Sequence, residues 1–388
     1  MLIGIDARMY RTSTAGIGRY SQNLIKNLLR LDQENQYILF MTPEDEKEFK
    51  TENLKGKNYK IRIVNIKHYS ISEQLKLPAI LNKEKLDLML FLNFNYPVFY
   101  RGKFISVIHD LTLFFYPETA RQTNFIKRLA FKFVIKKACE NSIHVIAVSS
   151  YTKNDIINHF HIAKEKIFVI PEAADERTLN FSDSIQRRIK EKYKILGPLI
   201  LYVGQFRPHK NIPGLIKAFA VLKKDIKKAK LAILGKPDPA DQDFWATLDI
   251  LDLKKDILMP GFVKDEELAS WYAIADVFVV PSFYEGFGLP GLEAMKAGLP
   301  VVSSNRTSLP EVYKDAALYF DPSNIGEIAD KIKMVLEDKK LKGKLIEKGK
   351  IVASSYSWQK TAEQTLDLLK QVEKSEVRNP KSETNPKF

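Results

Sequence analysis

The sequence predicts an α/β protein with two doubly wound parallel sheets that face each other across a central cleft. First, short apolar runs rich in Val, Ile, Leu and Phe alternate with longer stretches of helical period, the pattern of parallel sheets flanked by helices. Second, this alternation stops at a polar stretch near the middle of the chain and then begins afresh. Third, the length of 388 residues predicts two domains, since roughly 150 residues per domain is usual.

The strand candidates fall into two series, each made of short apolar runs bounded by polar or glycine-containing segments. In the first half the runs are Leu2–Asp6, Tyr37–Met41, Ile61–Ile66, Leu86–Leu92, Phe104–His109, Ile143–Val148 and Ile167–Ile170. In the second half they are Leu199–Gly204, Leu231–Gly235, Ile257–Pro260, Val277–Pro281 and Val301–Ser303. Helices are expected between the runs, among them Tyr20–Leu29, Ile212–Lys223 and Glu266–Ala275.

The domain boundaries are expected to follow the polar stretch. We expect a first domain over residues 1–172 and a second over 173–355, with the hinge in Pro171–Pro198. An amphipathic helix is expected over 356–374, and residues 377–388 have the composition of a mobile polar tail.

The composition is that of an ordinary folded protein and excludes several classes of partner and site. Cys139 is the only cysteine, which excludes internal disulfides and zinc sites with several thiolates and favours the cytoplasm. No apolar run is long enough for a membrane span, and the start of the chain does not resemble a signal peptide. The formal charge of +14 favours anionic partners such as nucleotides, phospholipid surfaces or nucleic acid.

The segment PSFYEGFGLPGLEAMKAGLP, residues 281–300, predicts a strand end, a glycine loop and a short helix. With Pro290 in the first turn, the amides around Gly288, Leu289 and Gly291 are expected to be unpaired and able to hold a diphosphate. Two carboxylates flank this helix start, and ionised Glu accepts hydrogen bonds from sugar hydroxyls. They are Glu285 in the loop and Glu293 in the helix. The alternative is a helix cap for Glu293 and a solvated loop charge for Glu285.

The segment LYVGQFRPHKN, residues 201–211, predicts a strand that ends at Gly204 and a loop that carries Arg207 and Lys210. Cations at the carboxyl end of a strand point into the crevice, where they can neutralise a diphosphate leaving group. A solvated basic loop is the alternative in a chain with this many lysines.

In the first half, the strand FISVIHD ends with His109 and Asp110, again at an edge that faces the crevice. The imidazole can donate to a substrate hydroxyl, while Asp110 can fix either the imidazole or the following loop. A purely structural His–Asp pair is the alternative. The segment AGIGRY, residues 15–20, is expected to be a glycine loop, in which Gly16 and Gly18 allow close approach to an anion. It does not match a dinucleotide fingerprint.

Taken together, six motifs resemble retaining glycosyltransferases of family 4, which have the GT-B fold of two Rossmann-like domains. The motifs are GIGRY, IHDLTLFFYPE, SSYTKNDI, VGQFRPHKN, GFVKDEEL and EGFGLPGLE, and they span nearly the whole chain. Within the family, HDL and SSNRTSLPEV are most similar to bacterial mannosyltransferases of polysaccharide and O-antigen synthesis. The chain departs from many relatives at Pro171-Glu172-Ala173-Ala174, where they have an Asn-Gly pair, and this departure affects the hinge contacts to the donor.

The resemblance implies a role for each candidate site residue. Glu293 would bind the nucleotide ribose, Glu285 with the Phe287 and Gly288 amides the donor sugar, and Arg207 with Lys210 the diphosphate. Gly16 and Gly18 would close on the phosphates, and His109 would contact the transferred sugar. The remaining donor-binding positions implied are Gly204, Phe262, Val263, Gly286 and Leu289. The resemblance also implies an acceptor site on the first domain, a helix after Trp358 that crosses back onto that domain, and no metal or other cofactor.

The implied reaction moves a hexose, with mannose and a guanine nucleotide favoured, from a nucleoside diphosphate sugar to a hydroxyl of a glycan or lipid-linked acceptor. The configuration at the anomeric carbon is retained. No residue is an obvious covalent nucleophile, so stabilisation of the leaving group by fixed cations and amides is the expected main contribution.

Two other functions are compatible with parts of the sequence. A GT-B enzyme of another reaction, such as a nucleotide-sugar epimerase, shares the fold but should lack the joint cation and E-x7-E set. A nucleic-acid-binding protein would use the positive charge, but no nucleic-acid module is recognisable and none is expected as a partner. Separately, the basic helix Thr123–Cys139, with Phe125, Leu129 and Phe133, could lie on an anionic membrane at the cytoplasmic face or bury its apolar face in the core.

Overall fold

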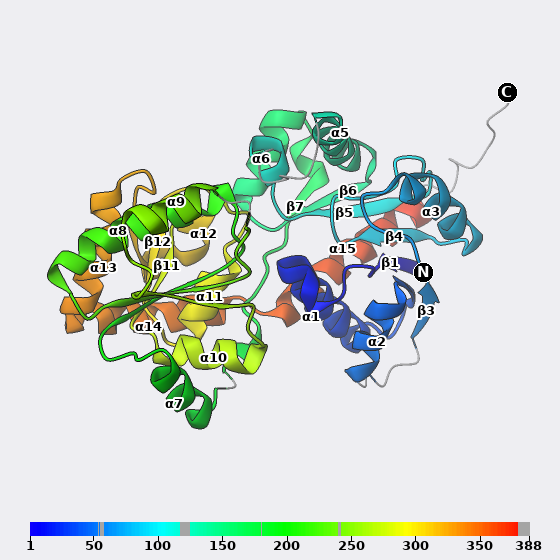
Figure 1. Cartoon of the computed structure of the whole chain (residues 1–388). Helices are drawn as coiled ribbons and strands as arrows, with labels where there is room; N and C mark the ends of the chain where they lie inside the picture. Colours follow the sequence, from blue (N-terminus) through cyan, green and yellow to red (C-terminus); the bar gives the residue numbers. More distant parts are fainter. Residues whose placement is uncertain (53, 55–57, 117–124, 180, 240–241, 379–388) are drawn as a thin grey trace.

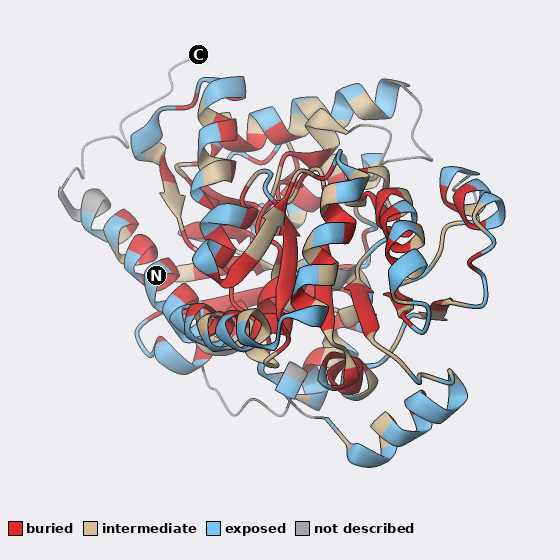
Figure 2. Ribbon diagram, turned by 90° about the vertical axis from the view of Figure 1, so that its left-hand side faces the viewer, coloured by how far each residue is buried: buried red, intermediate tan, exposed pale blue. Residues whose placement is uncertain are grey.

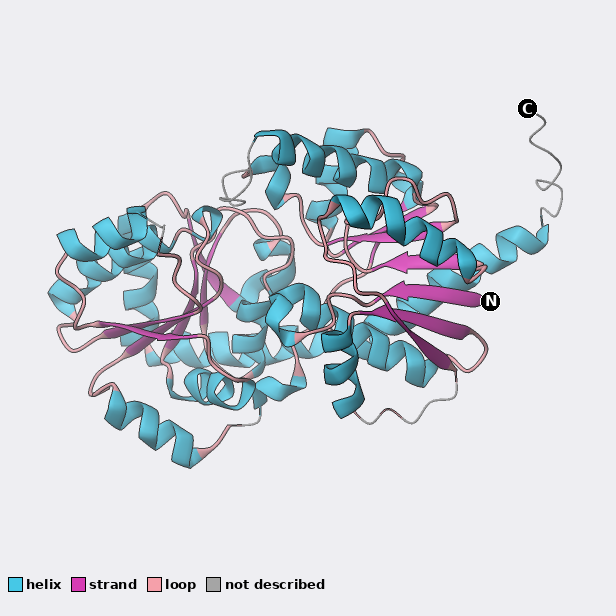
Figure 3. Ribbon diagram, turned by 45° about the vertical axis from the view of Figure 1, so that its right-hand side comes forward, coloured by secondary structure: helices cyan, strands magenta, loops and turns pink. Residues whose placement is uncertain are grey.

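The computed structural model describes residues 1–52, 54, 58–116, 125–179, 181–239 and 242–378. It contains two α/β domains side by side, each with a central sheet covered by helices (Figures 1 and 3). Parallel strands are buried on both faces and need such cover. The predicted fold class, two parallel α/β sheets, is therefore confirmed.

The first sheet has, among the described residues, seven strands in the order β3-β2-β1-β4-β5-β6-β7, and the pairings are parallel. The strands are β1 (Leu2–Asp6), β2 (Gln36–Met41), β3 (Tyr59–Ile63), β4 (Leu88–Phe91), β5 (Phe104–Ile108), β6 (His144–Ala147) and β7 (Ile167–Val169). Their helices are α1 (Ala15–Leu31), α2 (Pro43–Thr51), α3 (Ile71–Lys83), α4 (Thr112–Phe115), α5 (Phe125–Asn141) and α6 (Ser150–Phe160), with 3₁₀ turns η1 (Thr12–Thr14) and η3 (Lys164–Lys166).

The second sheet has, within the described part of the chain, six parallel strands in the order β10-β9-β8-β11-β12-β13. They are β8 (Leu199–Val203), β9 (Lys230–Leu234), β10 (Ile257–Gly261), β11 (Val277–Val280), β12 (Val301–Ser304) and β13 (Ala317–Phe320). The helices are α7 (Asp183–Lys192), α8 (Ile212–Asp225), α9 (Gln242–Ile250), α10 (Asp265–Ile274), α11 (Leu289–Lys296), α12 (Leu309–Tyr313), α13 (Ile325–Glu337), α14 (Lys339–Ser355) and α15 (Trp358–Arg378), with 3₁₀ turns η4 (Glu176–Leu179), η5 (Pro208–Lys210) and η6 (Lys314–Ala316).

The strand order defines where a ligand can enter each domain. In both sheets the chain starts at a central strand and later returns to that strand's other side, so β1 lies beside β4 and β8 beside β11. At such a switch point the loops after the two strands diverge and leave a crevice at their carboxyl ends. The loops after β1 and β4, and after β8 and β11, are therefore the ones that bound candidate sites.

The core follows the strands, as Figure 2 shows by the concentration of buried residues on the sheets and on the inner faces of the helices. Strand β4, for example, is buried along its whole length, and so is β11. The apolar runs that identify strands in the sequence are therefore the residues that fill the space between sheet and helices.

Three local expectations are wrong. The sequence pattern gives no strand at β13, a four-residue edge strand whose half-buried Leu318 and Tyr319 weaken its apolar signal. The outer strand expected at Ile61–Ile66 is β3, residues 59–63, because its register is set by pairing with β2. The segment AGIGRY is not a loop, since α1 already begins at Ala15.

The last helix, α15, lies against the first domain, as its position behind α1 and β1 in Figure 1 indicates. The Trp358 ring packs edge-on against Tyr20 of α1 at 5.7 Å between centroids, and the Thr361 hydroxyl donates to the Pro171 carbonyl at 2.7 Å. Of the tail expected at 377–388, residues from 379 onward lie outside the described residues.

Candidate functional site

The loops at the carboxyl ends of the two sheets touch each other directly. Gly286, after β11, lies so close to the first domain that an added Cβ would be 1.9 Å from the carbonyl oxygen of His109, after β5. Beside this contact, the Tyr284 hydroxyl donates to Asp155 Oδ2 at 2.6 Å and accepts from the Leu111 amide at 3.3 Å. The structure thus brings together the candidate residues of the two halves, and any side chain at position 286 would separate them.

Glu285 and Lys210 form an ion pair between the loops after β11 and β8. Lys210 Nζ donates to both carboxylate oxygens at 2.7 Å, and Ser282 Oγ donates to Glu285 Oε1 at 2.7 Å. The Glu285 backbone is fixed as well, because its amide donates to Thr307 Oγ1 at 3.1 Å and its carbonyl accepts from Ser308 Oγ at 2.9 Å. With side chains only 20% and 13% exposed, the pair is neither a solvated loop charge nor a solvated basic loop.

His209, a neighbouring residue that the sequence analysis missed, helps to hold the loops after β8 and β11 together. Its carbonyl accepts from the Phe283 amide at 2.8 Å, which ties η5 to the loop after β11. The side chain is 7% exposed, and burial together with the charges of Lys210 and Arg207 lowers the pKa of His209 to about 2. His209 is therefore a neutral spacer between two cations.

Arg207 and Gly204 lie at the mouth of the same crevice. Arg207 is half-buried and directly precedes η5, in an extended conformation with φ −135° and ψ 148°. Gly204 directly follows β8, and its amide donates to the Leu234 carbonyl at 3.0 Å. An added Cβ on Gly235 would lie 2.0 Å from the Gly204 oxygen, so this rim of the sheet is closely packed backbone.

Glu293 is buried within α11, with the residue only 4% exposed, and is not a simple helix cap. Tyr272 of α10 donates its hydroxyl to Glu293 Oε2 at 3.1 Å. Burial raises the pKa of Glu293, while the positive charge of Arg19 and the Tyr272 hydroxyl oppose the rise. Both groups that oppose the rise therefore favour the ionised form, which can accept hydrogen bonds from ligand hydroxyls.

The start of α11 differs in one detail from the expectation. Gly288 precedes the helix with φ 89°, a left-handed conformation, and an added Cβ would lie 2.4 Å from the Tyr313 hydroxyl. Pro290 stands in the first turn, as expected. The Gly291 amide is not unpaired, because it donates to the Gly288 carbonyl at 3.2 Å. The anion-binding capacity of this end therefore rests on Gly288 and Leu289.

His109 is held at both ring nitrogens by hydrogen-bond acceptors. Nδ1 lies 2.7 Å from Glu172 Oε1 and Nε2 lies 2.9 Å from the Leu92 carbonyl oxygen. Because a carboxylate and a carbonyl are both acceptors, this arrangement favours the imidazolium, in which both nitrogens donate. Burial by itself lowers the pKa of His109, but the hydrogen bond and charge of Glu172 outweigh it, and the pKa is raised. Asp110 fixes the following loop instead, by accepting from the Thr112 amide at 2.7 Å.

Glu172 is the second functional residue that the sequence analysis missed. In the sequence it stands out only as part of the departure from the Asn-Gly pattern, yet it supplies the partner of His109 from the hinge. The signal that could have found it is a carboxylate immediately after the apolar run Ile167–Ile170, at the same sheet edge as His109.

The two glycines of AGIGRY occupy different environments in the first turns of α1. Gly18 is buried, and an added Cβ would lie 2.1 Å from the Arg11 carbonyl oxygen, so its space serves packing rather than a ligand. Gly16 is exposed with nothing within 4 Å of an added Cβ. In the second domain, Phe262 is 72% exposed just after β10, and Val263 beside it is half-buried.

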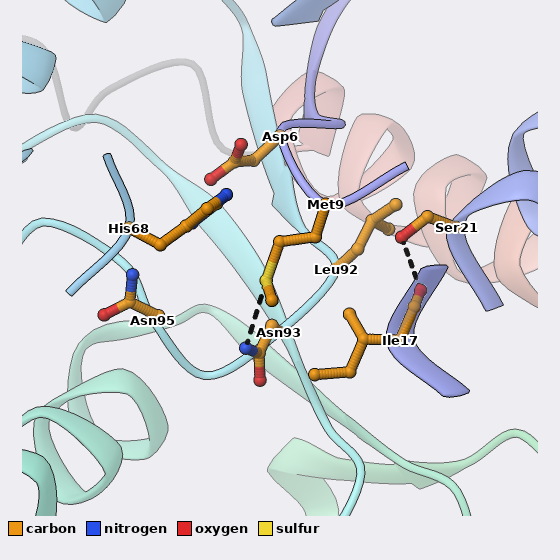
Figure 4. A pocket seen from close by; sticks show the side chains of 8 residues that line it. All are labelled: Asp6, Met9, Ile17, Ser21, His68, Leu92, Asn93 and Asn95. Atoms are coloured by element: carbon orange, nitrogen blue, oxygen red, sulfur yellow. Dashed lines mark hydrogen bonds between the residues drawn. The ribbon is translucent and has the colours of Figure 1, made fainter. Parts of the chain in front are cut away.

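A small pocket lies at the switch point of the first sheet (Figure 4). Its lining residues are Asp6, Met9, Ile17, Ser21, His68, Leu92, Asn93 and Asn95. The pocket adjoins the candidate site because Leu92, which lines it, bonds His109. The sequence analysis missed it, although Asp6 ends β1 and Asn93 and Asn95 follow β4.

Behind the pocket, a buried ionic network holds these polar groups in place. The Arg8 side chain is fully buried and donates to Asp6 Oδ2 and Glu73 Oε1, each at 2.7 Å. Glu73 also accepts from Asn95 Nδ2 at 2.8 Å, and Nδ1 of His68 lies 3.7 Å from Glu73 Oε1. Burying a charge this deeply costs free energy unless it is paired, and these ion pairs supply the partners. The same contacts hold Asp6 and His68 in place at the pocket.

Metal and membrane features are absent from the part of the chain that the structure describes. Among the described residues no group of three or more His, Cys, Asp or Glu side chains is arranged to hold a metal ion. None of the described helices combines the length and apolarity that crossing a bilayer requires.

Two protein families match the chain in succession. The family described as Glycosyltransferase Family 4 matches residues 14–177, and the family described as Glycosyl transferases group 1 matches residues 185–352. The O-antigen chain mannosyltransferase B of Escherichia coli is 31% identical over 270 residues, which are 69% of this chain and 70% of that relative. The chain belongs to glycosyltransferase family 4. It is a glycosyltransferase, and the resemblance inferred from the motifs is confirmed.

Other similar proteins agree with this family. The O-antigen chain mannosyltransferase RfbU of Salmonella typhimurium is 33% identical over 217 residues, 56% of each chain. The solved structure of Anabaena HepE with UDP and glucose has a TM-score of 0.74 at 16% identity and covers 95% of this chain and 99% of its own. Sucrose-phosphate synthase from Thermosynechococcus elongatus has a TM-score of 0.76 at 20% identity, covering 97% and 100%. These two structures establish the GT-B fold, and the family as a whole uses nucleotide-sugar donors, typically without a metal.

Proposed function

We propose that the protein transfers a hexose, with mannose favoured, from a nucleoside diphosphate sugar to a hydroxyl of a growing glycan, with retention at the anomeric carbon. The observation that carries this proposal is the Lys210–Glu285 pair, fixed beside the contact between Gly286 and His109. A cation for the diphosphate and a carboxylate for the sugar then stand together where the two domains meet. Mannose and GDP-mannose are favoured because O-antigen mannosyltransferase B and RfbU are mannosyltransferases by name.

For the donor, we assign the ribose to Glu293 and the diphosphate to Arg207 and Lys210. Glu293 is buried and accepts from Tyr272 on one oxygen, so its other oxygen can accept from a ribose hydroxyl. Arg207 and Lys210 lie on either side of neutral His209, and both cations would oppose the negative charge that grows on the departing diphosphate. The sugar itself would contact Glu285 and the amides of Phe287 and Gly288. The donor site would be completed by the neighbouring positions Gly204, Phe262, Val263, Gly286 and Leu289.

In the chemical step, the bond between the anomeric carbon and the phosphate oxygen breaks as the acceptor oxygen bonds to that carbon on the same face. The acceptor proton passes to the departing phosphate oxygen. His109 lies next to the transferred sugar in this arrangement. Since both of its ring nitrogens already donate, it would act through its positive charge rather than through a new hydrogen bond. Gly16, exposed at the start of α1, would close on the phosphates, whereas buried Gly18 would support that turn.

For the acceptor, we assign the first domain, residues 1–172 completed by the helix over 356–374, while residues 173–355 bind the donor. The pocket beside His109 offers carboxylate, imidazole and amide groups over an apolar floor, which suits the hydroxyls of a neutral sugar. We therefore assign the acceptor end beside this pocket to a sugar residue of the growing glycan.

Helix α5 supports a place of action at the cytoplasmic face of an anionic membrane. Leu129 and Phe133 do not belong to the core, because they are 51% and 53% exposed, and Ile126 on the same face is 73% exposed. Ile126, Leu129 and Phe133 form an apolar stripe, and Lys136 follows on the same face. Lys137 Nζ lies 6.0 Å from the centroid of the Phe133 ring. An apolar stripe flanked by cations fits a surface of anionic lipids. Loss of vesicle binding in Leu129→Ser with Phe133→Ser would support this placement.

The decisive experiment is calorimetry against a panel of GDP, UDP and ADP sugars, followed by product analysis with the donor that binds. We expect GDP-mannose to bind tightest and Glu293→Gln to weaken that binding by about tenfold, since a hydrogen bond to a charged group contributes about 1.5–3 kcal/mol. If no nucleotide sugar binds, or if Glu293→Gln binds as the parent does, the proposed donor site is wrong.

A further inference from the structure

Arg19, on α1 of the first domain, reaches across to two carboxylates, one in the hinge and one in the second domain. Its Nη2 donates to Asp265 Oδ1 at 2.5 Å, and its Nη1 donates to Asp175 Oδ2 at 3.5 Å. Asp175 lies in the hinge segment that follows β7. Asp265 begins α10, the helix that also carries Tyr272. The guanidinium side chain is 17% exposed and Asp175 is 6% exposed, so the contact is largely shielded from solvent.

This ionic contact lies beside Glu293. Lys296, three residues after Glu293 on α11, donates to the Ala174 carbonyl next to Asp175 at 3.4 Å, which places Glu293 near this contact. The charges of Asp175 and Asp265 accordingly raise the pKa of Glu293, and the charge of Arg19 lowers it. Tyr272 completes the surroundings by donating to Glu293. Without Arg19, three carboxylates would lie near each other with no cation from the first domain to compensate them, and protonation of Glu293 would be favoured. A protonated Glu accepts fewer hydrogen bonds from ligand hydroxyls.

We propose that Arg19 is a positioning residue of the donor site, which compensates Asp175 and Asp265 only when the two domains are together and thereby keeps Glu293 ready for the nucleoside. The inference rests on the proposed function of Glu293 as the ribose-binding residue. Because Arg19 comes from the other domain, it links closure to binding of a nucleoside diphosphate: each favours the other by the same factor. Asn23, one turn later on α1, supports the same side by donating to Asp175 Oδ2 at 3.2 Å.

The test measures GDP, UDP and ADP affinity by calorimetry in Arg19→Gln, with Arg62→Gln as the matched control. Arg62 lies on edge strand β3 and pairs with Glu84 at 3.3 Å, away from the domain contact. We expect Arg19→Gln to weaken binding of the preferred nucleoside diphosphate by about tenfold, Arg19→Lys to restore part of the loss, and Arg62→Gln to match the parent. The proposal would be overturned if Arg19→Gln bound the preferred nucleotide as tightly as the parent protein does.

A second pair of variants separates charge compensation from a merely structural tie between domains. Adding Asp265→Asn to Arg19→Gln removes one uncompensated carboxylate and should restore part of the affinity, whereas a lost structural tie would not be restored. In a Glu293→Gln background, Arg19→Gln should cause little further loss. Equal losses in both backgrounds, or no restoration by Asp265→Asn, would refute the role of Arg19. Failure of the parent to bind any of the three nucleotides, or normal binding by Glu293→Gln, would instead refute the proposed donor site.

Discussion

The charge on His109 depends on a single residue of the hinge, Glu172. Two acceptors hold the ring, and only one of them, the Glu172 carboxylate, carries a charge that favours the imidazolium. Both side chains are largely buried, 16% and 6% exposed, so solvent screens their attraction little. At the scale of residues, a substitution in the hinge therefore controls the electrostatics of the site.

The first prediction concerns the pH dependence of stability. The pKa of His109 is raised in the folded protein, so the pair stabilises fully below the pKa of an unfolded histidine, about 6.5, and this stabilisation is lost as the pH rises through the raised value. Glu172→Gln should lower the free energy of unfolding by about 1–3 kcal/mol near pH 6 and by less near pH 9. Thermal melting from pH 6 to 9 checks this, with exposed Glu165→Gln as control. A loss that does not depend on pH would contradict it.

The second prediction concerns Lys210. Lys210→Met removes the cation that we propose faces the leaving group and leaves the Glu285 carboxylate without this cation, so kcat should fall by about 10² to 10³ while the protein stays folded. Lys254→Met, which breaks the exposed pair with Asp249, should leave kcat unchanged. A steady-state assay with the preferred donor measures both variants. Near-normal kcat in Lys210→Met would remove this residue from the catalytic set.

At the scale of elements, helix α1 shows how one segment serves both packing and the site. Its first turns contain Gly18, which allows η1 to pack closely, and exposed Gly16. Arg19, the residue after Gly18, reaches Asp265 of the second domain, and Tyr20 packs on His109 at 4.7 Å between ring centroids. The close packing at Gly18 therefore sets the position from which the following two side chains reach the site.

The third prediction uses these two glycines as a matched pair. Gly18→Ala places a Cβ 2.1 Å from a backbone oxygen and should cost about 1–3 kcal/mol in stability. Gly16→Ala meets nothing and should stabilise the helix by about 0.5–1 kcal/mol. Chemical denaturation of both variants distinguishes them. If Gly16 approaches the phosphates as proposed, Gly16→Ala should also weaken donor binding in spite of its greater stability; unchanged binding would exclude that role.

At the scale of the whole molecule, the two domains are held together on both sides of the site. On one side lies the Arg19 contact with Asp265, and on the other Glu311 of α12 accepts from the Ser150 and Tyr151 amides at 2.7 and 3.0 Å. Those amides start α6 of the first domain, where a carboxylate is favoured by the helix dipole. The structure is thus a closed arrangement with the two domains in contact.

The fourth prediction concerns this arrangement. Glu311→Ala removes the carboxylate from the start of α6, so the domains should separate more often and the radius of gyration measured by X-ray scattering should increase in the absence of donor. Exposed Glu347→Ala on α14 serves as the control. Saturating nucleotide should bring the variant back toward the parent value. Identical scattering of parent and Glu311→Ala without nucleotide would show that this contact does not hold the domains.

The sequence by itself determined the fold class and the loops that carry the candidate residues. Apolar periodicity depends on a residue and its close neighbours along the chain, so strands such as β1 and β8 can be recognised from their own residues. The same holds for Gly288 and Pro290, whose conformational preferences mark the start of α11 locally. The edge strands β3 and β13 were misplaced or missed because their boundaries depend on pairing with a neighbouring strand.

Only the tertiary structure decided which charges meet. Glu172 joins His109 across 63 residues, Lys210 joins Glu285 across 75, and Arg19 joins Asp265 across 246. The sequence contains each of these side chains, but an ion pair depends on distance and burial, and both are set by how the sheets stack their carboxyl ends against each other. That is why the cations and carboxylates could be predicted as candidates, while their partners and the contacts of Arg19 emerged only from the fold.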